Sequence, residues 1–283
     1  MKDEMRSNFD ILLTEYPSGM QVNTQLAARY TDISPEQIIV GNGAAELINA
    51  YMHLSAERMT GVCLPTFEEY PNRLPKDKLV CFKPKNKDFS YTSSDLIAYF
   101  EHTPIEQLII INPDNPSGNL LSKAELLTLL EWSKRKGIQL LIDESFLDFA
   151  REDDTYSLFN KELLSQNPHL VVIKSISKSF GVPGLRLGFL ATGDLQLIQR
   201  LRKEISIWNI NSFAEFYMQI FIKYREDYKK ARIKFIEERK RFFQCLQHIN
   251  YLRVIPSAAN YFLCEVVGKY TTEDICSILL ANH

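Results

Sequence analysis

The sequence has little cysteine, and its cysteines are not arranged to build a structural site. Cys63, Cys81, Cys245, Cys264 and Cys276 are odd in number, scattered and never spaced as C-x-x-C. A disulfide framework and a zinc cluster both need regularly spaced cysteines, so the pattern argues against each of them. We expect no metal site and a reducing, cytoplasmic environment.

Long apolar runs and an excess of one charge are also missing. No segment approaches the roughly 20 apolar residues that cross a bilayer, and the first residues, MKDEMRSNFDILLTEYP, lack the apolar stretch of a secretion signal. The 33 Lys and Arg nearly balance the 35 Asp and Glu. This balance gives no electrostatic case for binding nucleic acid or an anionic membrane. We expect a soluble, non-secreted protein whose ligands are small molecules.

Short β-branched runs alternate with longer amphipathic stretches between residues 37 and 192. This rhythm predicts an α/β fold, with a mostly parallel sheet sandwiched by helices. The predicted strands are Gln37–Val40, Gly61–Leu64, Leu79–Phe82, Leu108–Ile111, Gln139–Ile142, Leu170–Ile173 and Leu187–Ala191. The clearest helix is Ser122–Lys136, because Ser122 and Glu125 form a capping box and Gly137 can end the helix.

The pattern changes after about residue 210. Tyr217–Asn250 is a long helical run with interleaved charges, and strands Leu252–Ile255 and Tyr261–Val267 and helix Glu273–Leu280 follow. We therefore expect an N-terminal arm (1–30), a large domain (31–210), and an interdomain helix with a smaller α+β domain (211–283). Two strands and one helix would leave an open sheet edge, so we expect this smaller domain to be truncated.

The most informative segment is KSISKSFGVPGLRLG, residues 174–188. It follows a predicted strand and groups several hydroxyls and the guanidinium of Arg186 around the amine of Lys178. Such a group suits a phosphate dianion beside a reactive nitrogen, and a rigid strand end suits an amine that forms an imine. Two other interpretations stay open here. One is a surface lysine in a serine-rich loop, and the other is the S-x-x-K of penicillin-recognising enzymes, although no K-T-G or S-D-N follows.

Two further loops follow predicted strands. The rigid turn in IINPDNPSG, residues 110–118, can present the amide of Asn115 where α/β folds place ligands, although an ordinary Asn-Pro turn is the alternative. In LLIDESFLDF, residues 140–149, Asp143 ends a buried strand, where an unpaired carboxylate would be costly. We expect a cationic partner such as a protonated pyridine nitrogen; a helix N-cap or a structural ion pair is the alternative.

Two loops nearer the amino terminus complete the pattern. IIVGNGAAELI, residues 38–48, reads as a strand, a tight turn and a helix whose first amides can bind an anion. Glu46 stands where a dinucleotide fingerprint needs Gly or Ala, so a phosphate site is favoured over an NAD site. PTFEEY, residues 65–70, places Phe67 after another strand, where its ring can stack on a planar heterocycle or pack in the core.

These five segments, in this order, resemble those of the fold-type I pyridoxal-phosphate enzymes, the aspartate-aminotransferase superfamily of class I and II aminotransferases. The sequence is most similar to the branch of histidinol-phosphate aminotransferase and threonine-phosphate decarboxylase, over nearly the whole chain. The most specific part is S-x-S-K-x-F-x-x-P-G-L-R-x-G, at residues 175–188. The resemblance implies the fold of these transferases, in which the large domain binds the cofactor.

The resemblance also implies residue roles. Lys178 would hold pyridoxal phosphate as a Schiff base, Asp143 would protonate the pyridine nitrogen, and Asn115 would bond the phenolic oxygen. Phe67 would stack on the ring. The phosphate would be held by Ser175, Ser177, Arg186 and the amides of Gly43, Ala44 and Ala45. Tyr16, in Glu-Tyr-Pro, is similar to the tyrosine that reaches the neighbouring subunit's phosphate, which implies a homodimer with shared active sites.

Three functional hypotheses follow. The first is an aminotransferase that acts on a small, phosphorylated or phosphonylated amino acid or amine. The alternative is a decarboxylase similar to threonine-phosphate decarboxylase, because aminotransferases of this branch usually have a tyrosine at the position of Phe146, and the Trp208–Asn211 segment is also similar to the decarboxylases. The third is a non-catalytic binding or regulatory domain with the same fold.

The family pattern extends beyond both ends of this chain. Family members continue past residue 283 through an arginine that grips the substrate carboxylate, and they begin with a longer arm. No arginine of this chain can be assigned to that role. We therefore expect this arginine to lie beyond residue 283, and the chain to be a fragment or a domain of a fusion protein.

Overall fold

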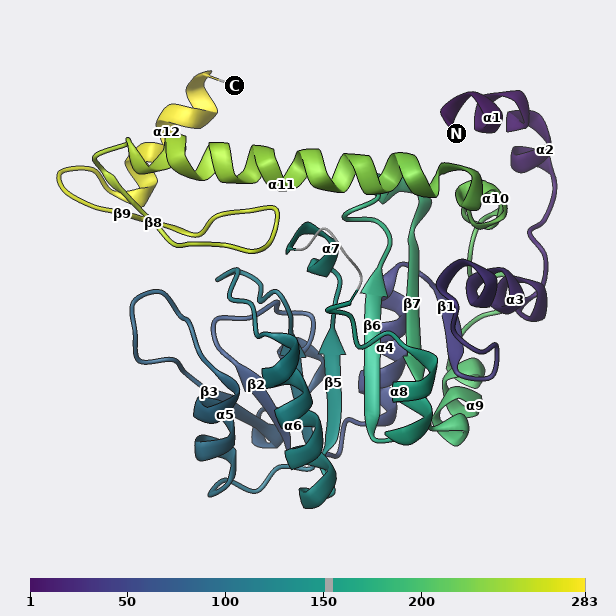
Figure 1. Ribbon diagram of the computed structural model, residues 1–283, viewed down its shortest axis with the longest axis horizontal. Coiled ribbons are helices and arrows are strands. Elements are labelled where there is room, and N and C mark those ends of the chain that lie inside the picture. The colour runs from purple at the N-terminus through teal and green to yellow at the C-terminus, as the bar shows by residue number, and fades with distance from the viewer. Residues whose placement is uncertain (151–154, 283) are drawn as a thin grey trace.

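A seven-stranded sheet in the order β1-β7-β6-β5-β4-β2-β3 forms the centre of the computed structural model, which describes residues 1–150 and 155–282 (Figure 1). The strands are β1 (Ile38–Asn42), β2 (Thr60–Cys63), β3 (Leu79–Phe82), β4 (Gln107–Ile111), β5 (Gln139–Asp143), β6 (Leu170–Ser175) and β7 (Leu187–Thr192). All seven predicted strands are confirmed, with ends shifted by at most two residues.

The sheet is mostly parallel, as predicted. Strands β3, β2, β4, β5 and β6 run parallel to one another, whereas β7 is antiparallel to both β6 and β1. Strand β4 is buried along its whole length, because helices cover both faces of the sheet. A strand covered on both faces has no polar side to show, so it reads as one continuous apolar run.

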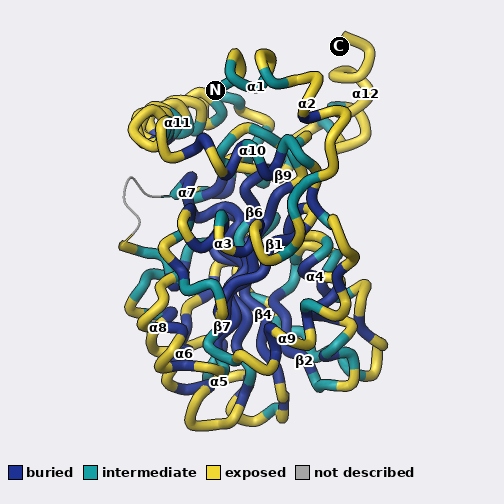
Figure 2. The backbone as a smooth tube through the Cα atoms, turned by 90° about the vertical axis from the view of Figure 1, so that its right-hand side faces the viewer, coloured by how far each residue is buried: buried dark blue, intermediate teal, exposed yellow. Residues whose placement is uncertain are grey.

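Helices form a layer on each face of the sheet, and Figure 2 shows the buried strands between them. Alternate residues of β4 enter the two cores: Leu108 and Ile110 pack on one face, and Ile109 and Ile111 on the other. The first face is covered by α3 (Met20–Thr31), α5 (Ser93–Phe100), α6 (Lys123–Lys136), α8 (Lys161–Gln166) and α10 (Ser212–Ile220). The second face is covered by α4 (Ala44–Leu54) and α9 (Leu195–Glu204).

Helix α6 has the predicted ends. The Ser122 hydroxyl accepts the backbone N–H of Glu125, the Glu125 carboxylate accepts the N–H of Ser122, and Gly137 ends the helix with φ 68°. Three further short helices are α1 (Lys2–Ser7), α2 (Phe9–Thr14) and α7 (Leu147–Ala150). Across the described residues, none of the helices is both long and apolar enough to span a membrane.

The predicted helical run 217–250 is divided in two. Helix α10 ends at Ile220, a 3₁₀ turn spans Phe221–Tyr224, and α11 spans Arg225–Gln247. The reason is packing: Phe221 is buried against the ring of Tyr30, with centroids 4.6 Å apart, so the chain turns there. Helix α11 then extends over the carboxyl edge of the sheet (Figure 1).

A second, two-stranded sheet follows α11. It pairs β8 (Leu252–Val254) with β9 (Cys264–Val266) antiparallel, and α12 (Thr272–Asn282) comes last. Strand β9 begins three residues later than predicted, and Tyr261 lies outside it, because the Tyr261 hydroxyl bonds to a loop of the large sheet. We call residues 248–282 the C-terminal lobe.

Candidate active site

The loops that carry the predicted site residues meet at one edge of the large sheet. Strands β4, β5 and β6 are parallel neighbours, so the loops that follow them leave the sheet at the same edge. Because β7 is antiparallel to β6 and to β1, the start of β7 and the end of β1 reach this edge too. The topology therefore brings Asn115, Asp143, Lys178, Arg186 and Gly43 together from four segments of the chain, at the carboxyl edge where α/β folds bind ligands.

Gly43 and Arg186 form the candidate phosphate site. Gly43 has φ 77° and directly precedes α4, so the first amides of that helix are free to bind an anion. A Cβ atom at Gly43 would lie 2.7 Å from Nη2 of Arg186, so the guanidinium lies against the turn. A Cβ atom at Gly188 would lie 2.4 Å from the amide nitrogen of Ala44, a close approach that only glycine permits. Free amides beside a guanidinium suit a phosphate group.

The loop between β6 and β7 adds the buried hydroxyl of Ser177. The Ser177 side chain is 7% exposed, and its Oγ has no hydrogen-bond partner among residues 1–150 and 155–282. Leaving a buried hydroxyl unpaired costs about 1–3 kcal/mol, so this atom marks a place where a ligand is expected. The buried Ser175 joins this loop to the loop after β5, because the N–H of Ser175 donates to Oγ of Ser145 at 3.1 Å. These residues fit the phosphate ester of pyridoxal phosphate.

Ser177→Ala is expected to weaken the binding of pyridoxal phosphate without destabilising the cofactor-free protein. The hydroxyl has no partner to lose before the cofactor binds, whereas a hydrogen bond to a charged phosphate contributes about 1.5–3 kcal/mol, or roughly 10- to 100-fold in affinity. Titration of the cofactor-free protein, followed by absorbance, measures this change. Ser133→Ala is the control, because the buried Ser133 hydroxyl bonds to the carbonyl of Leu130 in α6. An unchanged affinity in Ser177→Ala would contradict the assignment.

Two donors hold Asp143 at the end of β5. The carboxylate is buried, its Oδ1 accepts the N–H of Ser145 at 2.9 Å, and its Oδ2 accepts the hydroxyl of Tyr70 at 2.7 Å. Burial raises the pKa of Asp143, whereas these hydrogen bonds and the charge of Lys178 lower it. A buried carboxylate beside cationic groups can stabilise a protonated pyridine nitrogen.

The sequence did not reveal the role of Tyr70. Its side chain is fully buried, and its ring lies edge-on to that of Phe67, with centroids 6.3 Å apart. Phe67 is 41% exposed, so its ring has a surface open to a ligand. The only signal in the sequence was that Tyr70 comes three residues after Phe67 in PTFEEY, one helical turn further along.

Lys178 faces the same edge of the sheet. Its Nζ lies 5.5 Å from the ring centroid of Phe146, a buried residue of the loop after β5. The next residue, Ser179, anchors the loop by donating to Oδ2 of Asp148 at 2.8 Å, and Asp148 also forms an ion pair with Lys174. The exposed Lys178 amine is therefore carried by a loop that is fixed on both sides.

The loop that carries Asn115 is braced from within. The buried carboxylate of Asp114 accepts the hydroxyl of Ser117 at 2.6 Å and that of Tyr91 at 3.5 Å. Burial raises the pKa of Asp114 to about 6. The side chain of Asn112 bonds to both the N–H and the carbonyl of Leu121, which closes the loop. Asn115 is half-buried at the tip of this rigid loop.

The Tyr16 side chain packs on the ring of Trp208. The ring centroids are 4.7 Å apart, and the Tyr16 side chain is 79% exposed. Its predicted contact with the phosphate of a partner subunit stays a prediction.

Glu46 and Asn209 support the candidate phosphate site, which the sequence did not show. Glu46 accepts the N–H of Asn42 at 2.7 Å and the side-chain amide of Asn209 at 2.8 Å. The Asn209 amide also donates to the carbonyl of Val40 at 3.0 Å. The residue that breaks the dinucleotide pattern therefore holds the turn before α4 in place.

Known proteins are similar to this chain in both sequence and fold. L-serine phosphate decarboxylase from Sulfurospirillum multivorans is 32% identical over 281 residues, which cover 96% of this chain and 70% of that protein. L-serine phosphate decarboxylase from Campylobacter jejuni is 30% identical over 278 residues, with the same coverage of both chains. The solved structure of a decarboxylase from Sulfurospirillum multivorans has a TM-score of 0.87 at 29% identity and covers 99% of this chain and 72% of that one.

The matches also include threonine-phosphate decarboxylases and histidinol-phosphate aminotransferases, which confirms the branch predicted from the sequence. The family model described as aminotransferase class I and II matches residues 13–283. Enzymes of this family use pyridoxal phosphate, the cofactor for which the sheet edge is suited. The chain therefore belongs to the aminotransferase class I and II family of pyridoxal-phosphate enzymes.

Proposed function

We propose that this protein is a pyridoxal-phosphate-dependent decarboxylase of a small phosphorylated amino acid. The proposal reverses the order of the sequence-based hypotheses, in which an aminotransferase came first. The similarity to L-serine phosphate decarboxylases supports it. The structural observation that carries it is Phe146, whose ring lies below the Lys178 amine where aminotransferases of this branch usually have a tyrosine hydroxyl.

The proposed roles of the site residues follow from their positions. Pyridoxal phosphate, when bound, supplies an electron sink for the electron pair of a bond at the substrate α-carbon. Lys178 would hold the cofactor and move a proton at that carbon, and Asp143 would keep the pyridine nitrogen protonated. Asn115 would bond the phenolic oxygen and Phe67 would cover the ring. The phosphate would be held by Ser175, Ser177, Arg186 and the amides of Gly43, Ala44 and Ala45.

Decarboxylation and transamination differ in what leaves the α-carbon. In decarboxylation the carboxylate leaves as CO₂ and a proton takes its place, so the amino group stays on the product. In transamination the proton leaves, and the amino group is passed to an acceptor. Lys178 would move the proton in either case, whereas the side chain of Phe146 has no hydroxyl that could share this role.

The test is product analysis of the cofactor-loaded protein with L-serine O-phosphate. We expect equimolar CO₂ and O-phosphoethanolamine in the absence of any 2-oxo acid. Turnover only when a 2-oxo acid is added, with a new oxo acid as product, would contradict the proposal and restore the aminotransferase hypothesis. Cofactor binding without turnover of any phosphorylated amino acid would favour the non-catalytic hypothesis.

We also propose that the protein forms a homodimer with shared active sites. Several large apolar side chains near Tyr16 are exposed: Ile11 (62%), Leu13 (65%), Ile207 (73%) and Trp208 (48%). Exposed apolar groups of this kind mark interfaces. Sedimentation velocity tests this proposal, and a monomer at all concentrations would contradict it.

A further inference from the structure

Tyr261 connects the C-terminal lobe to the loop that carries Asn115. Its hydroxyl donates to the carbonyl of Asp114 at 2.8 Å, directly before Asn115. A second link lies nearby, because the N–H of Ala258 donates to the carbonyl of Gly118 at 2.9 Å. A Cβ atom at Gly118 would lie 2.7 Å from the backbone Cα of Ser257, so the two loops approach each other closely at this glycine.

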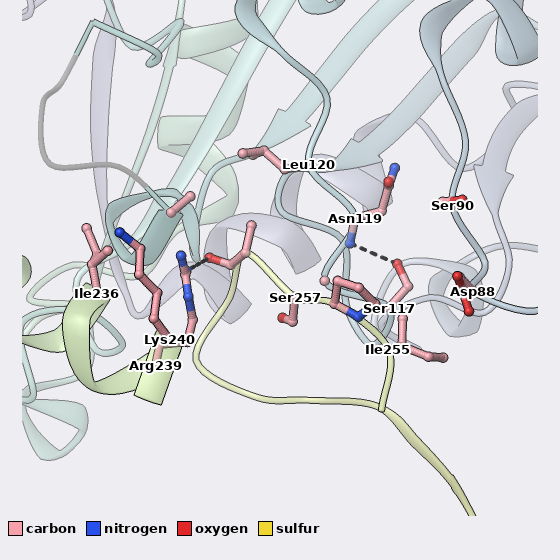
Figure 3. Close-up of a pocket in the computed structure, with 14 residues that line it drawn as sticks. Asp88, Ser90, Ser117, Asn119, Leu120, Ile236, Arg239, Lys240, Ile255 and Ser257 are labelled. Carbon is pink, nitrogen blue, oxygen red and sulfur yellow. Dashed lines mark hydrogen bonds between the residues drawn. The ribbon is translucent and has the colours of Figure 1, made fainter. Parts of the chain in front are cut away.

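A cavity of about 750 Å³ runs along this contact, and Figure 3 shows Ser117 and Asn119 on one of its walls and Ser257 on the loop from the C-terminal lobe. Arg239 of α11 lies at the other end and donates to the carbonyl of Ala258. The segment that leads to Tyr261 is therefore fixed to both α11 and the Asn115 loop.

The ring of Tyr261 makes a second connection, to Lys178. It stands edge-on to the ring of Phe146, with centroids 5.2 Å apart and planes at 83°. The Phe146 ring in turn faces Nζ of Lys178 at 5.5 Å. Phe146 also packs with Phe149 and Ala259 in a small apolar cluster against which Tyr261 lies. One side chain of the lobe therefore supports two separate loops of the candidate active site.

The surroundings keep the Tyr261 phenol protonated. Burial raises its pKa, and the negative charges of Asp114 and Asp143 raise it further. The protonated hydroxyl is the donor in the hydrogen bond to the carbonyl of Asp114.

We propose that Tyr261 is a positioning residue, which sets the orientation of the Asn115 amide through its hydroxyl and the position of Lys178 through its ring. The inference rests on the cofactor roles proposed above for Asn115 and Lys178. An amide that donates to the phenolic oxygen draws negative charge from it, and this lowers the pKa of the Lys178 nitrogen joined to the cofactor. A misplaced Asn115 amide would let that pKa rise.

The test compares Tyr261→Phe, which removes only the hydroxyl, with Tyr261→Leu, which also removes the ring. In the holoenzyme without substrate, we expect the pH midpoint of the visible cofactor absorbance to rise by about half a unit in Tyr261→Phe and by more in Tyr261→Leu. Cofactor affinity should fall by about 2- to 10-fold in Tyr261→Phe, as for the loss of one hydrogen bond. Tyr251→Phe is the matched control, because Tyr251 packs on Tyr270 within the lobe. It should behave as wild type.

A double-mutant cycle separates positioning from general support of the fold. If Tyr261 acts through Asn115, Tyr261→Phe should shift the midpoint in wild type and not in an Asn115→Ala background. An equal shift in both backgrounds, or an unchanged midpoint in Tyr261→Phe, would overturn the inference. Wild-type protein that shows no visible cofactor band would overturn the proposed function itself, and this inference with it. Decarboxylase or aminotransferase activity has no bearing on these readouts.

Discussion

Lys178→Ala is expected to eliminate the covalent adduct with pyridoxal phosphate and to reduce turnover by roughly 10²- to 10⁴-fold or more, the range of a lost general acid-base group. The amine is proposed both to join the cofactor and to move the substrate proton. The loop between β6 and β7 holds no other lysine, and the nearby Lys174 at the end of β6 is paired with Asp148. The measurement is the absorbance spectrum with added cofactor before and after borohydride reduction. Wild type should show a reducible band and the variant none.

The control for this experiment is Lys203→Ala, which removes an exposed lysine of α9 on the second face of the sheet. It should retain the band and the turnover of wild type. A reducible band of normal intensity in Lys178→Ala would show that another amine holds the cofactor.

Asp143→Asn is expected to lower turnover by about 10²- to 10³-fold, the range for one lost electrostatic contact in an active site, while the cofactor still joins Lys178. The asparagine keeps the size of the side chain and an oxygen that can accept from Tyr70, but it has no charge to hold a pyridine nitrogen protonated. The two readouts are turnover and the borohydride-reducible band, which together distinguish this variant from Lys178→Ala.

Tyr70→Phe is a milder change at the same carboxylate than Asp143→Asn. It removes one donor from the carboxylate, so the pKa of Asp143 should rise from a value that burial already raises. The Asp143 carboxylate is then protonated more readily at low pH. We therefore expect a smaller loss of turnover than in Asp143→Asn, and the loss should be greatest at acidic pH. Full turnover in Asp143→Asn would show that the reaction does not need the Asp143 carboxylate.

The strands, and the sheet edge at which the candidate site residues lie, could be predicted because both depend on local sequence. A strand buried on two faces is a short apolar run, and residues such as Asp143 and Lys178 stand out because they lie at or just after the end of such a run. Parallel pairing then places the ends of several strands at the same edge. For this reason five loops could be assigned to one site before their contacts were known.

The supporting contacts could not be predicted, because they join segments that are far apart in the sequence. Tyr70 bonds to Asp143, 73 residues away, and Asn209 bonds to Glu46, 163 residues away. Tyr261 was predicted to begin a strand, yet its side chain reaches the loop of Asp114, 147 residues away. Nothing in the local pattern of these residues indicates which distant group they meet.

The choice between decarboxylation and transamination could not be predicted from the sequence, for a different reason. The bond that breaks is the one held perpendicular to the cofactor ring, and the groups that orient the substrate decide which bond that is. In this chain the visible differences were Phe146 and the segment Trp208–Asn211. The hypotheses therefore shared a cofactor and differed in a geometry that residues 1–283 do not specify.

The central claim, that Lys178 holds the cofactor, is tested most directly by locating the attachment site. Purified protein loaded with pyridoxal phosphate is reduced with borohydride, digested with trypsin and analysed by tandem mass spectrometry. We expect a pyridoxyl group on Lys178 within SISKSFGVPGLR, residues 175–186, where trypsin no longer cleaves after the modified lysine. A pyridoxyl group on Lys174 or another lysine, with this peptide unmodified, would contradict the account.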